Sequence, residues 1–283
     1  MPELPEVEVL CRYLAPRLVG RTIRTVVVHR AKAVRPWTPT GFARWVRGAE
    51  VRSVSRRAKF LRFELVHGST ATPRLLLGHL GMTGRMYVRP AAGWVGAHVS
   101  VVLGLGDEDW VFEDVRQFGG FGREADRLEA LGPEPLDDDF DVARLARCLG
   151  GSRQAIKTRL MDQAVLAGVG NIYASEALHV AGIAPDRETR GLDGAEVAQL
   201  WAALREVLNE AIRLGSSLPL DFTGDGAGDG LFYYGRASED QESSAERFRV
   251  YDRAGQPCYG CGGAIERLVQ AGRSTFCCRR CQR

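Results

Sequence analysis

The sequence has no run of about 18 apolar residues, the length that a helix needs to cross a lipid bilayer. Its opening, MPELPEVEVL, also lacks the positive charge and the apolar segment of a secretory signal peptide. No segment is repeated along the chain. These absences argue against a membrane protein and a secreted protein, so we expect a cytoplasmic one. In that compartment the seven cysteines are expected to be thiols or metal ligands rather than disulfides.

The composition is typical of a folded protein with room for two domains. Its 283 residues are 45% hydrophobic and 26% charged, which excludes wholesale disorder. The net charge is only +3, but some segments, such as RRAKFLR and CCRRCQR, are basic and others, such as EPLDDDFD and SEDQESSAE, are acidic. This uneven charge allows a basic face that binds a polyanion, although ordinary solvated charge explains the same composition.

The chain divides into segments of different periodicity. Residues 5–20 have the apolar spacing of a helix, at Val7, Leu10, Leu14 and Leu18. A bend is expected at Pro16 and the helix end at Gly20. Between about residues 22 and 120, short β-branched or alternating segments predict an antiparallel sandwich or barrel. The turn-rich segment LGPEPLDDDFD is the best domain boundary, and helical patterns follow it. Residues 215–247 are rich in Gly, Asp and Ser and predict a long loop.

Four cysteines near the C-terminus form two C-x-x-C pairs with sixteen residues between them. Two such pairs supply four thiolates for a tetrahedral, structural zinc site, whereas coincidental free thiols are the alternative. The predicted ligands are Cys258, Cys261, Cys278 and Cys281. The segment between the pairs predicts a hairpin with its turn near Ala271–Gly272, which zinc would hold folded. The remaining cysteines are predicted not to bind the metal: Cys11, Cys148 and Cys277.

Three further patterns suit contact with DNA. Arg273 lies at the predicted hairpin turn, where a cation on a rigid tip suits a phosphate. Asn171 lies between a glycine turn and a helix, where it can cap the helix or bind a phosphate. Arg116 and Phe118 lie two apart in a glycine-flanked segment after a strand, and such a pair can wedge into a base stack. Each pattern also has an ordinary structural explanation, such as a helix cap or a core phenylalanine beside a surface arginine.

Taken together, these segments resemble the formamidopyrimidine-DNA glycosylase family, the Fpg/Nei family of DNA glycosylase/AP lyases. The matches run in family order from PELPEVE through RRAKFL, HLGMTGR, LGPEPL, AIKTRLMD and GVGNIYASEAL to the four-cysteine tail. They cover nearly the whole chain. Leu4 favours a resemblance to the Fpg branch, because the Nei branch typically has glycine at this position.

The resemblance implies an α+β fold in three parts. Residues 1–131 would form an N-terminal catalytic, antiparallel β-sandwich with one leading helix. Residues 132–247 would form a helical helix–two-turn–helix DNA-binding domain with a long lesion-side loop at about 215–247, and residues 248–283 a C-terminal zinc finger hairpin. The implied cofactor is structural Zn2+, and the implied partner is double-stranded DNA containing damaged bases, held in the cleft between the two halves. A monomer associated with the nucleoid in the bacterial cytoplasm is expected.

The implied activity is excision of oxidised purines (8-oxoguanine and formamidopyrimidines) followed by strand cleavage through β,δ-elimination. Removal of Met1 would expose Pro2 as a secondary amine, and an α-amino group with a pKa of about 8 is partly neutral at physiological pH. Attack of this amine on the sugar C1′ would give an iminium that serves as an electron sink. Glu3 lies beside it and can move protons around the sugar. Glu6, one helical turn on, either raises the pKa of Glu3 or serves the helix dipole.

The resemblance assigns further residues to the DNA. Lys59 would contact a phosphate near the lesion and assist β-elimination, although it also reads as a surface strand lysine. Arg273 would assist δ-elimination, while Asn171 and Lys157 would hold a phosphate from the helical side. Three residues match the triad that fills the space left by the flipped nucleotide: Met82, Arg116 and Phe118.

The sequence departs from the family pattern at several positions. In DVRQFG, Val115 and Gln117 replace the proline and the second arginine of the family's DPRRFG. Gly96 stands near the place of a DNA-contacting histidine, and Ser152 stands where the family has a lysine, with Arg153 next to it. These changes are expected to weaken or retune DNA binding.

The largest departure is an acidic insertion with paired tyrosines in the long loop, at about residues 221–247. This insertion could alter the choice of base or remain disordered. Three alternative functions also stay open. The chain could prefer other lesions, such as oxidised pyrimidines or abasic sites. It could be a catalytically weak protein that binds lesion DNA. It could also be a small-molecule enzyme with an N-terminal proline, such as a tautomerase, in which the zinc finger would have no role.

Overall fold

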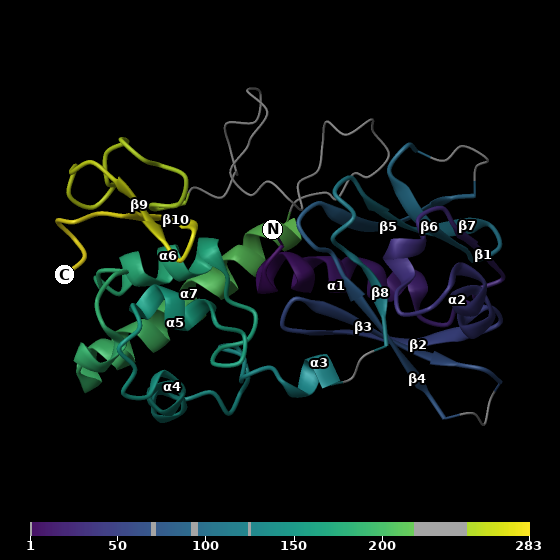
Figure 1. The fold of residues 1–283 in the computed structure, drawn as a ribbon, viewed down its shortest axis with the longest axis horizontal. Coiled ribbons are helices and arrows are strands. Elements are labelled where there is room, and N and C mark those ends of the chain that lie inside the picture. Colours follow the sequence, from purple (N-terminus) through teal and green to yellow (C-terminus); the bar gives the residue numbers. More distant parts are fainter. Residues whose placement is uncertain (1, 69–71, 92–95, 124–125, 218–247) are drawn as a thin grey trace. The chain divides into compact units, whose positions relative to one another are not determined.

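The computed structural model describes residues 2–68, 72–91, 96–123, 126–217 and 248–283. Contacts divide the chain into two compact units (Figure 1). The first unit contains the residues up to Glu129, and the second contains Ala130–Leu214 and the C-terminal tail. Met1 and nearly all of the loop expected at 215–247 lie outside the described residues.

The first unit contains two four-stranded antiparallel sheets. One has the strand order β1-β6-β7-β5, formed by Thr25–Val28, Val99–Gly104, Glu108–Asp114 and Gly84–Pro90. The other has the order β2-β3-β4-β8, formed by Glu50–Arg57, Phe60–Val66, Arg74–His79 and Gly120–Gly122. In β3 the side chains are alternately buried and half-buried, as expected for a strand with one face in a core. Both sheets contribute to one hydrophobic cluster, so the expected antiparallel sandwich is confirmed.

The helix α1 (Leu4–Leu18) is part of the same core. Figure 1 shows it in purple beside strands of both sheets. Its apolar positions are fully buried with Phe63 of β3 and Trp110 of β7. They are the four that the helical spacing predicts: Val7, Leu10, Leu14 and Leu18. Pro16 lies inside the last turn, and Gly20 follows the helix with a φ of +79°, in the left-handed region that favours glycine.

Three short helical segments in the first unit are absent from the sequence prediction: the 3-10 helix η1 (Ala31–Val34), α2 (Pro39–Val46) and the one-turn helix that ends the unit. The start of α2 carries a recognisable signal, because Thr38 Oγ1 accepts a hydrogen bond from the Gly41 N–H at 3.1 Å. The helix has only eight residues, so its periodic signal is weak within a segment that otherwise predicts strands. A one-turn helix, α3 (Asp126–Glu129), ends the unit.

The second unit consists of helices and a hairpin. The helices α4 (Val142–Leu149), α5 (Ile156–Met161), α6 (Asn171–Val180) and α7 (Gly194–Ser217) confirm the four helical patterns after residue 141. A 3-10 turn, η2 (Thr189–Gly191), precedes α7. The C-terminal tail forms the hairpin β9 (Glu266–Gln270) and β10 (Arg273–Cys277), whose β10 strand packs on α6. Among the described residues, no helix combines the length and the apolar composition needed to cross a bilayer.

Gly81 allows two loops of the first unit to approach each other closely. It follows β4 with a φ of +62°. A Cβ atom on Gly81 would lie 2.6 Å from the Gly119 nitrogen and 2.7 Å from the Phe118 carbonyl carbon. Real Cβ atoms do not come this close to backbone atoms. Only glycine therefore fits at position 81, where the loop after β4 meets residues 118–119.

We predict that Gly81→Ala lowers the free energy of unfolding more than Gly48→Ala does. Gly48 also has a positive φ, +81°, but no atom lies within 4 Å of its missing Cβ. Gly48→Ala should cost only the left-handed backbone penalty, about 1–2 kcal/mol. Gly81→Ala adds a backbone clash and should cost roughly 3 kcal/mol or more. Urea denaturation measures both, and equal losses would contradict the packing of these loops.

Candidate functional site

The N-terminal residues are held at the start of a buried helix. Pro2 is buried, and Glu3 and Glu6 are 2% and 4% exposed. The Glu3 N–H donates a hydrogen bond to Glu6 Oε2 at 2.7 Å, the arrangement of a capped helix start. Of the two interpretations of Glu6, this contact supports a role at the helix N-terminus. It also fixes the backbone directly after Pro2.

Lys59 lies in the two-residue turn between β2 and β3, since Arg57 pairs with Phe60 across the hairpin. Its neighbour Ala58 has a φ of +51°, which is uncommon for a residue other than glycine. Lys59 is only 9% exposed. This burial separates it from an ordinary surface strand lysine, the second interpretation that the sequence allows.

An ion pair connects this turn to α1. Arg56 donates from Nε to Glu8 Oε2 at 2.9 Å and from one terminal nitrogen to the Ala58 carbonyl at 3.1 Å. Glu8 also accepts a hydrogen bond from Arg12 Nε at 2.8 Å. Burial raises the pKa of Glu8, but the hydrogen bonds from Arg56 and Arg12 outweigh it and hold the pKa below its usual value. The helix that carries Pro2 is thereby joined to the turn that carries Lys59.

Asp114 organises the loop with the proposed wedge residues. Its buried carboxylate accepts hydrogen bonds from the backbone N–H groups of Phe118 and Gly119 at 2.8 Å each, and from that of Arg116 at 3.1 Å. Thr83 Oγ1 donates to the same carboxylate at 2.6 Å. The sequence interpretation overlooked Asp114, although an aspartate at a strand end before a glycine-flanked segment is a turn signal.

The three predicted void-filling side chains are all exposed. Met82 is 41% exposed and Phe118 is 54% exposed, which is unusual for large apolar side chains. The Arg116 guanidinium lies 5.0 Å from the centre of the Phe118 ring. In the departures from the family pattern, Val115 is exposed and Gln117 takes the left-handed backbone conformation with a φ of +54°. The loop therefore keeps a formed backbone and presents Phe118 and Arg116 outward.

A pocket of about 200 Å3 lies beside this loop, and the sequence interpretation missed it. Its lining includes three cations, Lys32, Arg35 and Arg127, together with His79 and Phe118. The Lys32 ammonium lies 5.3 Å from the centre of the Phe118 ring. These residues come from separate segments, so no local sequence pattern announces the pocket. Its charge suits an anionic group such as a phosphate.

His79 is a neutral donor in this basic surrounding. Its Nδ1 accepts a hydrogen bond from the Gly81 N–H at 3.1 Å, which leaves the ring proton on Nε2. Burial lowers the pKa of His79 to about 4, and the positive charges of Lys59 and Arg127 add to this effect. His79 is therefore neutral at physiological pH.

A single ammonium group joins three elements of the second unit. Lys157 of α5 is 1% exposed, and its Nζ donates to Asn171 Oδ1 and Thr275 Oγ1 at 2.7 Å each. It also donates to the Ser274 carbonyl at 3.2 Å, which accepts a second hydrogen bond from Asn171 Nδ2 at 2.9 Å. A DNA contact by Lys157 or Asn171 stays a prediction. What the structure adds is that Lys157 lies among protein acceptors and orients the Asn171 side chain.

Glu176 anchors the start of the C-terminal tail, and the sequence interpretation did not single it out. This α6 residue is 3% exposed. Its carboxylate accepts hydrogen bonds from three successive backbone N–H groups, those of Arg249, Val250 and Tyr251, at 2.7, 2.9 and 2.8 Å. The sequence does carry a signal for such a role, because a glutamate within an otherwise apolar helix segment needs a hydrogen-bonding partner if it is buried.

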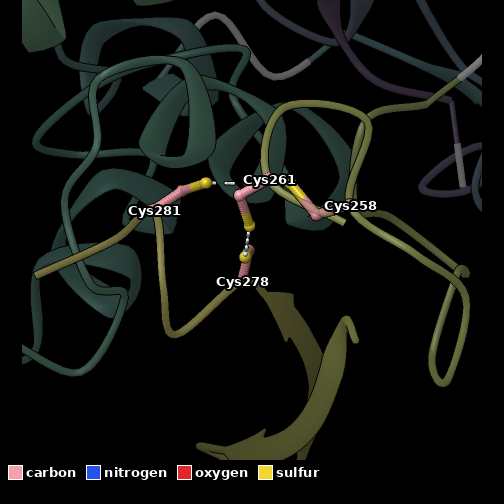
Figure 2. A group of neighbouring side chains, drawn as sticks. All are labelled: Cys258, Cys261, Cys278 and Cys281. Carbon is pink, nitrogen blue, oxygen red and sulfur yellow. Dashed lines mark hydrogen bonds between the residues drawn. The ribbon is translucent and has the colours of Figure 1, made fainter. Parts of the chain in front are cut away.

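Figure 2 shows the four predicted metal ligands converging from the two C-x-x-C pairs. Their sulfur atoms all lie within 4.8 Å of one another, with Cys258 and Cys281 at 3.8 Å and Cys261 and Cys278 at 3.4 Å. Tetrahedral zinc with Zn–S bonds of about 2.3 Å places its sulfur atoms about 3.8 Å apart, so these residues fit the ion. Cys277 is fully buried outside this cluster, where burial raises the pKa of its thiol.

Arg273 is presented at the tip of the hairpin. The turn residues Ala271 and Gly272 have φ values of 47° and 73°, a pair of left-handed conformations that closes a two-residue hairpin. Arg273 is the first residue of β10 and is exposed. The predicted turn is confirmed, and it leaves the guanidinium accessible.

Replacing Lys157 with methionine is expected to destabilise the second unit. Lys157→Met keeps most of the side-chain length but removes the ammonium donor from Thr275 Oγ1 and Asn171 Oδ1. The expected loss is about 2–4 kcal/mol in the free energy of unfolding. Arg153→Met, at an exposed neighbouring position, is the matched control and should change stability by less than about 0.5 kcal/mol. Chemical denaturation measures both losses. An unchanged stability of Lys157→Met would refute the role of this ammonium group in joining α5, α6 and β10.

The titration of His79 gives a pH prediction. The unfolded chain takes up this proton near pH 6.5, whereas the folded chain takes it up only near pH 4. Lowering the pH through this window therefore favours unfolding, because the unfolded state binds more protons. NMR titration of the His79 ring should show no protonation until the pH approaches 4. A midpoint near 6.5 would contradict the buried, cation-flanked position.

Comparisons with known proteins all indicate one protein family, and the relatives found align with the whole chain. Residues 1–121 match the formamidopyrimidine-DNA glycosylase N-terminal domain, and residues 131–220 match the formamidopyrimidine-DNA glycosylase H2TH domain. The formamidopyrimidine-DNA glycosylase of Sphingopyxis alaskensis is 42% identical over 293 residues, and that of Carboxydothermus hydrogenoformans is 36% identical over 283. Both alignments cover all of this chain and all of the relative.

Solved structures of the Lactococcus lactis Fpg protein have the same fold. One, a complex with THF-DNA and an inhibitor, has a TM-score of 0.85 at 29% identity and covers both chains fully. Another, with Fapy-dG containing DNA, has a TM-score of 0.84 at 30% identity and covers 99% of this chain and 100% of the other. From its sandwich, its helical unit and its full-length relatives, the chain belongs to the formamidopyrimidine-DNA glycosylase family.

Proposed function

We propose that the chain is a bifunctional DNA glycosylase and AP lyase of base excision repair. Its substrate is double-stranded DNA with oxidised purines, 8-oxoguanine and formamidopyrimidines. The observation that carries the proposal is the placement of Pro2 and Glu3 at the start of a helix buried in the sandwich core. Full-length similarity to proteins named formamidopyrimidine-DNA glycosylase supports it.

The proposed chemistry starts with Pro2 as a secondary amine after removal of Met1. Its lone pair bonds to C1′ of the damaged nucleotide, the bond from C1′ to the base breaks, and the base leaves with a proton. Opening of the sugar ring, with a proton delivered to O4′, gives an iminium. Removal of the C2′ proton then expels the 3′ phosphate, and a further proton removal expels the 5′ phosphate. Glu3 serves as the acid and base for the sugar.

The remaining site residues are proposed to bind and orient the DNA. Lys59 contacts a phosphate and assists β-elimination, and Arg273 assists δ-elimination. Asn171, oriented by Lys157, binds a phosphate from the helical side. The exposed side chains of Met82, Arg116 and Phe118 fill the space of the flipped nucleotide.

Zn2+ is the proposed cofactor, held by Cys258, Cys261, Cys278 and Cys281. Its role is structural, because the finger has a small core that metal ligation would stabilise. We propose residues 1–131 as the catalytic domain, 132–247 as the DNA-binding domain and 248–283 as the zinc finger.

A separate part of the proposal is the range of lesions that the enzyme excises. The L. lactis protein has been crystallised with Fapy-dG containing DNA and also with oxidised pyrimidine containing DNA. A wider range that includes oxidised pyrimidines is therefore the second candidate. Excision from matched duplexes with 8-oxoguanine, formamidopyrimidine or an oxidised pyrimidine ranks these substrates. Fastest release of a purine lesion supports the proposal, and fastest release of a pyrimidine lesion supports the alternative.

Borohydride trapping on lesion DNA tests the catalytic proposal. The unchanged protein should form a covalent adduct, and Pro2→Gly should reduce its rate by at least about 100-fold because the secondary amine is lost. Pro39→Ala, at the start of α2, is a control that leaves the N-terminus intact. Binding without an adduct would indicate a catalytically weak lesion binder, and an undiminished adduct with Pro2→Gly would exclude Pro2 as the nucleophile.

A further inference from the structure

His179 lies in the last turn of α6, on the side of the helix that contacts the tail. Its Nε2 is 3.5 Å from the sulfur of Cys258, within the range of a hydrogen bond to sulfur. Cys258 is 2% exposed and is one of the four clustered cysteines. No interpretation of the sequence assigned His179 a role.

The other ring nitrogen shows which tautomer the site favours. Nδ1 of His179 is buried and has no hydrogen-bond partner among the described residues. A proton on Nδ1 would be a buried donor without an acceptor, and it would leave the Nε2 lone pair facing sulfur. A proton on Nε2 avoids both costs, because it is donated to the sulfur and leaves only a lone pair unsatisfied.

The contact belongs to a series along one helix. Asn171 at the start of α6 donates to Ser274 of β10, and Glu176 in its middle accepts from the backbone of residues 249–251. His179 at its end reaches a metal ligand directly. The helix α6 therefore contacts the tail at three places. Of these three contacts, that of His179 is the one that involves a metal ligand.

We infer that His179 supports the metal site without binding the metal itself. It donates its Nε2–H to the Cys258 thiolate and thereby slows loss of zinc. Four thiolates on one Zn2+ carry a net charge of −2, so a donor that withdraws charge from one sulfur stabilises the site. The hydrogen bond also holds the first knuckle of the finger on α6. The inference rests on the zinc ion of the proposed function.

Zinc release into the chelating dye 4-(2-pyridylazo)resorcinol tests the inference without reference to DNA cleavage. His179→Phe keeps a ring of similar size and removes the donor, and it should release zinc about tenfold faster. His179→Gln keeps an N–H donor and should recover part of the difference. Val207→Ala is the matched control, because Val207 lines the same cavity of about 550 Å3 as His179 but is apolar.

The outcomes separate the inference from the proposed function. Purified protein without zinc would refute the proposed cofactor. Zinc present but released at the unchanged rate by His179→Phe would overturn the role of His179 alone, as would equally fast release by Val207→Ala. Nitrogen NMR of the unchanged zinc-bound protein decides the tautomer even if a variant fails to fold. A proton on Nε2 supports the inference, and a proton on Nδ1 overturns it.

Discussion

Burial of α1 in the core shared by the two sheets is the constraint on which the N-terminal site depends. Chain termini normally fray, yet Pro2 and Glu3 are buried here because the apolar face of the following helix is fully enclosed. The Glu6 carboxylate fixes the first turn, and the Glu8–Arg56 pair attaches the helix to the turn that carries Lys59. The proposed nucleophile, Pro2, is thereby held in a fixed position at the chain end, as the proposed catalysis by a terminal amine requires.

In the second unit, the C-terminal tail has too small a hydrophobic core to fix its own position on the helices. The contacts from α5 and α6 supply that position through buried polar groups. The Lys157 ammonium, the Asn171 amide and the Glu176 carboxylate each satisfy acceptors or donors of the tail. Such groups are costly to bury alone, so they favour one docking of the hairpin over others. The exposed Arg273 is held at the tip of that hairpin.

The sequence predicted elements well where the signal is local. The α6 and α7 patterns, the apolar spacing of α1 and the turn at Ala271–Gly272 all depend on neighbouring residues. Prediction failed where contacts are distant. The burial of Lys157 depends on partners 117 and 118 residues away, so no local pattern could show it, while its contact with DNA stays a prediction. The basic pocket around Lys32 and His79 likewise forms only when separate segments fold together. The α2 helix was missed because two turns produce little periodicity.

The most direct test of the central claim is mass spectrometry of the borohydride-trapped adduct after proteolysis. Intact mass first establishes whether Met1 is removed, since a retained Met1 would leave Pro2 as an amide. The expected result is an N-terminal peptide that begins at Pro2 and carries the nucleotide remnant on its proline nitrogen. A remnant on a lysine such as Lys59, or an N-terminal peptide that begins at Met1, would contradict the assignment of Pro2 as the nucleophile.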